Sequence, residues 1–111
     1  MCANALTHPL PEPLPPGQQV LAGQPIAAMA EFDLWPDVSI GLWEMTPGQV
    51  TDVESDEVFV VLSGRGTLDF DDGAPIALEP GALVRLRAGD HTTWTVTEPL
   101  RKLFISPSES E

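Results

Sequence analysis

From residue 38 to residue 106, short β-rich runs follow one another, and turn-forming residues end each of them. Pro-Gly pairs stand at 47–48 and 80–81, and Asp-Asp-Gly stands at 71–73. Many short strands at this spacing favour an antiparallel sandwich or barrel over βαβ units. The sequence therefore predicts an all-β domain with little helix, with strands at 38–45, 57–63, 67–70, 75–79, 82–87, 92–97 and 100–106.

The chain before residue 38 has a different character. Residues 1–18 contain five prolines, and a proline fits neither a helix interior nor a central strand. We expect an extended arm there, either mobile or laid across a neighbouring surface, with residues 19–111 forming one domain. Within residues 19–34 the only regular structure expected is one short helical turn.

Composition excludes several classes of partner. The chain has 17 acidic and 5 basic residues, a net charge of −12, whereas nucleic-acid binding needs many cationic contacts to phosphate. Nucleic acid and anionic membrane surfaces are therefore not expected as partners. No apolar run of about 18 residues is present, and no basic region precedes an apolar stretch, so a cytoplasmic location is expected. The single cysteine, Cys2, excludes an intrachain disulfide and a zinc knuckle.

Glu57 and Gly64 stand seven positions apart, and so do a glutamate and a glycine at the end of the first cupin motif. Gly81 and Gly89 keep the glycine spacing of the second motif, although Arg87 replaces its proline. The chain thus resembles the cupin superfamily. Closer resemblance to the ureidoglycine aminohydrolase and ethanolamine-utilisation cupins rests on a further set of short motifs: Trp43-Glu44, Pro47-Gly48, Trp94 and Glu98-Pro99-Leu100-Arg101-Lys102. The resemblance implies a double-stranded β-helix (a jelly-roll barrel), often dimeric.

The resemblance also implies a divalent metal, which most cupins hold with three histidines and the motif glutamate. In this chain only Glu57 remains of that set. The paired histidine positions fall on Thr51 and Val53 or on Val50 and Asp52. The position of the third histidine falls on Thr92. His91 is one residue away, and on a strand it would face the opposite side. Asp52, Glu54, Asp56 and Glu57 could supply a replacement set, but solvated acids are the simpler interpretation. We expect no metal and no cofactor.

Candidate site residues follow from period-two alternation along the expected strands. Glu57 shares a face with Phe59 and Val61, Thr92 with Trp94, and Lys102 with Leu100. Glu57, Thr92, Trp94 and Lys102 are expected to meet at one barrel mouth, with Glu57 and Lys102 close enough to interact and as the candidate catalytic pair. Trp43, Glu44, Thr92, Trp94 and Arg101 are the candidate ligand-binding residues, although only one of Trp43 and Glu44 can face the cavity.

Three functions remain open at this point. The first is a cupin that binds a small polar molecule in its barrel without the usual metal. The second is a hydrolase or isomerase, similar to ureidoglycine aminohydrolase, that uses Glu57 with an irregular or absent metal site. The third is a structural module whose barrel is filled by side chains. A homodimer is expected, with the proline-rich arm or the region around Trp35 at the contact.

Overall fold

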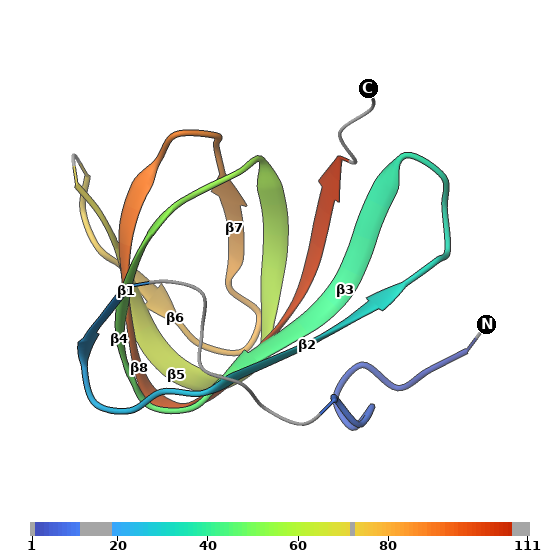
Figure 1. Ribbon diagram of the computed structural model, residues 1–111, viewed down its shortest axis with the longest axis horizontal. Helices are drawn as coiled ribbons and strands as arrows, with labels where there is room; N and C mark the ends of the chain where they lie inside the picture. The colour runs from blue at the N-terminus through green and yellow to red at the C-terminus, as the bar shows by residue number, and fades with distance from the viewer. Residues whose placement is uncertain (1, 12–18, 72, 108–111) are drawn as a thin grey trace.

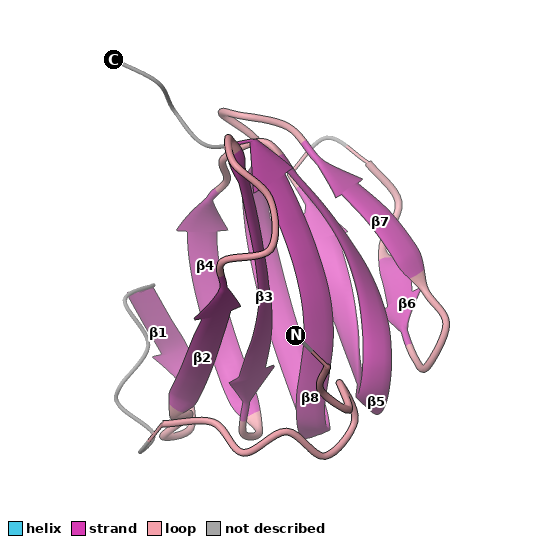
Figure 2. Ribbon diagram, turned by 90° about the vertical axis from the view of Figure 1, so that its right-hand side faces the viewer, coloured by secondary structure: helices cyan, strands magenta, loops and turns pink. Residues whose placement is uncertain are grey.

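The computed structural model of the chain describes residues 2–11, 19–71 and 73–107. In this part of the chain all regular structure is β-strand, which confirms the all-β prediction (Figure 2). No helix long and apolar enough to cross a membrane occurs among the residues described. The strands are β1 Gln19–Ala22, β2 Ala27–Phe32, β3 Val38–Met45, β4 Gly48–Val53, β5 Glu57–Phe70, β6 Ile76–Leu78, β7 Leu83–Leu86 and β8 His91–Pro107.

Two long strands, β5 and β8, hold the fold together by running through both layers of the barrel (Figure 1). In the first layer, the beginning of β8 pairs with β4 and with the end of β5, giving the order β1-β4-β8-β5-β6. In the second layer, the end of β8 pairs with β3 and with the start of β5, giving the order β2-β3-β8-β5-β7. All pairings are antiparallel, and the sheet curls into the jelly-roll barrel that the sequence predicted.

The bend in these two strands corrects the predicted boundaries. Residues 57–63 and 67–70 were expected as separate strands, as were 92–97 and 100–106, but each pair forms one strand with an irregular register at the bend. The glycines in the middle allow this close approach. A Cβ on Gly64 would overlap the carbonyl oxygen of Pro99, and a Cβ on Gly66 would overlap that of Thr95. Glycine here keeps two strands together instead of ending one of them.

Gly64→Ala is expected to destabilise the fold strongly. Gly64 has a φ of +94°, which L side chains rarely adopt, and its added methyl would also collide with β8. Gly81→Ala is the matched control, because Gly81 has a φ of +96° and open space around it. We expect a loss of about 1–2 kcal/mol in unfolding free energy for the control and about twice that for Gly64→Ala. Equal losses in urea unfolding of the two variants would show that the approach of Pro99 costs nothing.

Three strands lie where the sequence analysis placed none. Residues 19–34 form β1 and β2 instead of a helical turn, and β4 begins at Gly48, directly after the predicted turn. β1 and β2 are edge strands that pair with β4 and β3, so their conformation comes from these neighbours more than from their own propensity. β4 is rich in polar residues and was therefore overlooked, although its Val50 is fully buried.

The described part of the N-terminal arm lies against the outer face of the second layer. The Arg101 guanidinium on β8 donates from Nη1 to the carbonyl oxygens of Ala5 at 3.0 Å and His8 at 2.9 Å. The His8 ring meets the edge of Phe32, with 5.0 Å between centroids. An apolar hollow of about 280 Å³ remains between arm and sheet beside Leu42. Most of the proline-rich segment, residues 12–18, lies outside the described residues.

Candidate functional site

The centre of the candidate site is an ion pair between two strands of the second layer. Lys102 lies on β8 opposite Trp43 of β3 and Val61 of β5, and its Nζ is 2.7 Å from Oε2 of Glu57, the first residue of β5. The side chains are 8% and 20% exposed. The structure thus brings the candidate catalytic pair together inside the barrel. An ion pair this far from bulk water is costly to form, because both charges lose much of their hydration.

Three aromatic rings surround the same ammonium. Lys102 Nζ is 4.5 Å from the ring centroid of Phe59, 4.7 Å from Trp94 and 4.9 Å from Trp43. The Trp94 ring in turn packs against both other rings, with centroids 5.4 Å from Phe59 and 5.6 Å from Trp43. Aromatic faces attract a cation within about 6 Å. Trp43, Phe59, Trp94 and the Glu57 carboxylate therefore form a cage around the ammonium, which we call the lysine cage.

Glu54, which lies between β4 and β5, orients the inward side chains of the first layer. Its Oε2 accepts a hydrogen bond from Thr92 Oγ1 at 2.6 Å and from the indole Nε1 of Trp94 at 3.0 Å. The Glu54 backbone is fixed by hydrogen bonds with Gly89 and Asp90. From the sequence, Glu54 is expected to be a solvated acid or, less simply, a metal ligand, and its contact with Trp94 is not predicted. The available signal was that a buried tryptophan needs an acceptor for its N–H.

Asp52 adds a third carboxylate to this end of the barrel. It stands opposite Thr92 in the register of β4 and β8, on the inward face. Partial burial, and next the negative charge of Glu54, raise the pKa of the Asp52 carboxyl above its ordinary value. We call the half-buried side chains of Trp43, Asp52, Glu54 and Glu57 the barrel mouth. It carries three carboxylates beside the single ammonium of Lys102.

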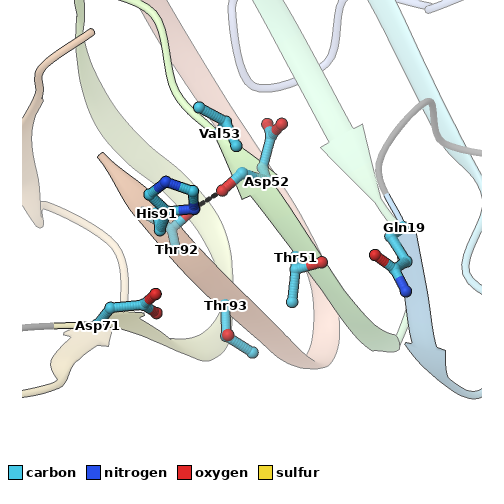
Figure 3. Close-up of a pocket in the computed structure, with 8 residues that line it drawn as sticks. All are labelled: Gln19, Thr51, Asp52, Val53, Asp71, His91, Thr92 and Thr93. Atoms are coloured by element: carbon cyan, nitrogen blue, oxygen red, sulfur yellow. Dashed lines mark hydrogen bonds between the residues drawn. The ribbon is translucent and has the colours of Figure 1, made fainter. Parts of the chain in front are cut away.

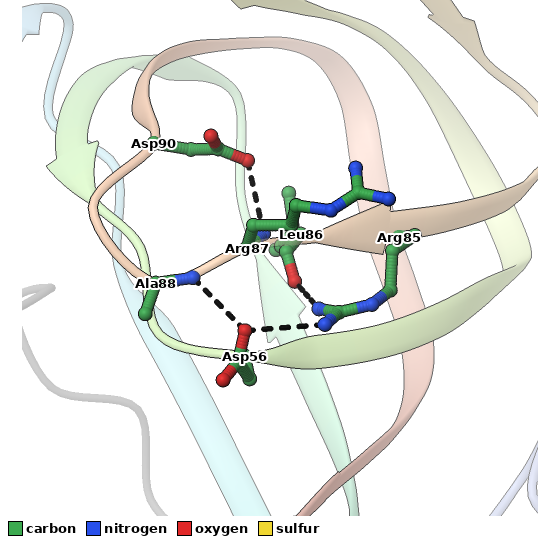
Figure 4. A network of polar contacts seen from close by, with 6 residues as sticks. All are labelled: Asp56, Arg85, Leu86, Arg87, Ala88 and Asp90. Carbon is green, nitrogen blue, oxygen red and sulfur yellow. Dashed lines mark hydrogen bonds and ion pairs between the residues drawn. The ribbon is translucent and has the colours of Figure 1, made fainter.

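A network at the rim holds the start of β5 in place (Figure 4). Asp56 Oδ1 accepts hydrogen bonds from the backbone N–H of Ala88 at 3.0 Å and from Arg85 Nη2 at 3.2 Å. These two contacts, the backbone one first, lower the pKa of the exposed Asp56 carboxyl. Asp90 closes the same turn by accepting from the N–H of Arg87 at 2.9 Å. Because Asp56 precedes Glu57, this network also sets where Glu57 enters the barrel.

Two of the candidate ligand-binding residues do not join this site. Trp43, and not Glu44, faces the interior. Glu44 lies on the outer face, where its Oε1 is 3.4 Å from Nε of Arg101. Arg101 is buried there by the N-terminal arm, as described above. Of the seven predicted residues, the structure groups five, namely Trp43, Glu57, Thr92, Trp94 and Lys102, and places Glu44 and Arg101 on the opposite side of the sheet.

The donor set does not fit the divalent metal that cupin resemblance implies. The Glu57 carboxylate accepts a hydrogen bond from Lys102, and the Thr92 hydroxyl donates one to Glu54. His91 is exposed and lines a groove of about 440 Å³ with Gln19, Thr51 and Thr93, and the same groove also reaches Asp52 and Thr92 (Figure 3). No group of three or more His, Cys, Asp or Glu side chains suited to a metal ion is found in the described ranges. We therefore derive no chemistry through a metal.

Comparison with known proteins supports the cupin assignment. The family model of the EutQ-like cupin domain matches residues 37–104. The solved structure of the Clostridium difficile EutQ protein is 20% identical, with a TM-score of 0.66, covering 78% of this chain and 71% of that chain. A Pseudomonas syringae protein of unknown function is 22% identical, with a TM-score of 0.71, covering 92% of this chain and 45% of that chain. Ectoine synthase from P. lautus is 13% identical, with a TM-score of 0.68, covering 76% and 66%.

No functionally curated protein matches the sequence. At these identities the structural likenesses show the fold alone. The barrel and its inward Glu57 define a small cupin, as the sequence predicted. More narrowly, because the matching model spans more than half of the residues, the chain belongs to the EutQ-like cupin domain family.

Proposed function

We propose that the barrel mouth binds a small polar molecule without a metal ion. The observation that carries this proposal is the Glu57–Lys102 pair, held at 2.7 Å inside the lysine cage. Placing such a pair out of water often adds nothing to stability compared with apolar side chains, so its presence favours a role in recognition or acid–base work. Trp43 would supply an apolar wall, and the carboxylates and ammonium would fix polar groups of the ligand.

The charge of the barrel mouth limits the class of ligand that it can bind. Asp52, Glu54 and Glu57 outnumber Lys102, and an anionic molecule would meet repulsion from at least two of these carboxylates. A neutral or cationic polar molecule would not be repelled by these carboxylates. The middle of the barrel is filled by Trp94 and Phe59, which leaves the half-buried mouth as the place for a ligand.

A second candidate is an enzyme of hydrolase or isomerase type, similar to ureidoglycine aminohydrolase. The contact of Glu57 with Lys102 favours it, because the carboxylate could accept a proton from a substrate while the ammonium stabilises negative charge that develops nearby. It stands second because the aminohydrolase chemistry is expected to need a metal and the donor set here does not fit one.

The two matched variants Glu57→Gln and Glu44→Gln test the proposal. Small molecules that copurify with the protein are identified by mass spectrometry and then added back in thermal unfolding. We expect a ligand that stabilises the native protein to lose at least tenfold in affinity with Glu57→Gln and to bind Glu44→Gln normally, since Glu44 lies outside the barrel. If Glu44→Gln alone loses binding, the site is on the outer face. If no small molecule stabilises the protein, the barrel is a structural module.

We also propose a homodimer. Apolar side chains are exposed at both edges of the second layer: Leu34 and Trp35 follow the edge strand β2, and Val58 and Leu83 lie on the paired strands β5 and β7. Single exposed apolar residues are ordinary, but two of them together beside an unpaired strand edge favour association with a second copy. The cytoplasmic location stays a prediction from composition.

A further inference from the structure

Lys102 is the only lysine in the chain, and it stands among partners that a bound cation would have. Its ammonium contacts one carboxylate oxygen and lies over three ring faces, each within 5 Å of Nζ. No other cationic side chain is placed this way in the described ranges. Arg65 and Arg85 pair with exposed acids, Arg87 is exposed, and Arg101 faces outward. The strands β3, β5 and β8 together thus build a seat for one primary ammonium.

The same arrangement explains the mismatch with a metal. Glu57 stands at the position of the metal-binding glutamate that the cupin resemblance implies, and Thr, Val or Asp stand at the positions of the implied histidine ligands. A divalent ion prefers such nitrogen and oxygen donors, whereas an ammonium is well served by one carboxylate and aromatic faces. In this chain the Glu57 carboxylate contacts the Lys102 ammonium, and the three rings of the lysine cage surround that ammonium.

We propose that the Lys102 ammonium is the resident cation of this barrel, a covalently tethered replacement for a metal ion, and that the lysine cage is a specific seat for an alkylammonium group. The cation neutralises Glu57 beside Asp52 and Glu54 and holds Trp43 and Trp94 in their packed positions. Lys102 holds the mouth together in this way whether or not the mouth binds the ligand proposed above.

Chemical rescue tests this inference. Lys102→Ala removes three methylene groups and the ammonium, which together have the size and charge of n-propylammonium. Added to the variant, n-propylammonium chloride is expected to raise the melting temperature by about 4 °C more than the same concentration of sodium chloride. The neutral analogue 1-propanol is expected to give no such rise. The control variant Arg65→Ala, which breaks an exposed ion pair with Glu79, is expected to show no rescue by either compound.

The native protein supplies two further readouts in case Lys102→Ala does not fold. Reductive methylation followed by mass spectrometry should modify only the α-amino group in the native state and also Lys102 after denaturation, because the Lys102 side chain is 8% exposed. Zinc, manganese or nickel chloride should leave the melting temperature of the native protein unchanged. Three results would each overturn the proposal. The first is rescue by 1-propanol equal to that by n-propylammonium, and the second is labelling of native Lys102 at the rate of an exposed amine. The third is stabilisation by any of these metals.

Discussion

Replacing Trp94 by alanine is expected to lower the free energy of unfolding by about 4 kcal/mol. The side chain is 2% exposed and packs against both Phe59 and Trp43, so its removal leaves a cavity in the middle of the barrel. Two further losses add to the cavity. Glu54 loses the indole donor at 3.0 Å, and the Lys102 ammonium loses one of its three ring faces. Urea unfolding followed by circular dichroism measures the change.

The other tryptophans are the controls for this prediction. Trp35 is 68% exposed in the single chain. At protein concentrations at which the chain is monomeric, Trp35→Ala is expected to change the free energy of unfolding by no more than about 0.5 kcal/mol. Trp43 is half-buried at the mouth, so Trp43→Ala should fall between the two. If Trp94→Ala cost no more than Trp35→Ala, Trp94 would not be the packing centre of the barrel.

Alternation along β8 allowed the inward side of the site to be predicted from sequence. His91, Thr93 and Thr95 lie toward the outer side, while Thr92 and Trp94 are buried. The same two-residue period placed Lys102 inside, on the face of Leu100 and Phe104. A strand alternates whatever its partners are, so the facing of each residue follows from one correctly assigned neighbour. Alternation alone does not predict the contact between Glu57 and Lys102. That prediction also requires the register of β5 on β8, which came from the cupin resemblance.

Contacts made by loops and edge strands could not be derived in this way. Glu54 belongs to no strand, and its position depends on hydrogen bonds with Gly89 and Asp90, which come from a turn 35 residues further along the chain. β1 and β2 lack a strong pattern of their own and exist because β4 and β3 offer them partners. Local sequence carries little information about structure that is imposed by distant neighbours.

Arg101 shows that the burial of an outward-facing side chain could not be predicted from the sequence. Arg101 was expected among the ligand-binding residues, but period-two alternation along β8 turns it away from Lys102, to the outer face. An outward arginine would ordinarily reach water. The N-terminal arm covers it instead, with the carbonyl oxygens of Ala5 and His8 as acceptors. A backbone carbonyl carries no residue-specific signal, so nothing in the sequence marked these two partners.

Lys102→Met is expected to cost about 3 kcal/mol in unfolding free energy, toward the lower end of the range for a broken buried pair because Glu57 is 20% exposed. Methionine keeps much of the apolar stem but leaves the Glu57 carboxylate without its cation and close to Asp52 and Glu54. Glu57→Gln should cost much less, about 1 kcal/mol, because the amide oxygen can still accept from Lys102 and the three rings still surround the ammonium.

The double variant Glu57→Gln/Lys102→Met decides whether these effects come from the pair. With both charges removed, no carboxylate is stranded at this position, so the double variant should be more stable than Lys102→Met alone. The coupling energy from the four unfolding free energies should be about 2 kcal/mol. The exposed pair Arg65–Glu79, at 3.5 Å with side chains 53% and 62% exposed, provides the control cycle and should give about 0.5 kcal/mol or less. Equal coupling in the two cycles would mean that water screens Lys102 as it screens Arg65, and the lysine cage would then contribute nothing specific to the barrel.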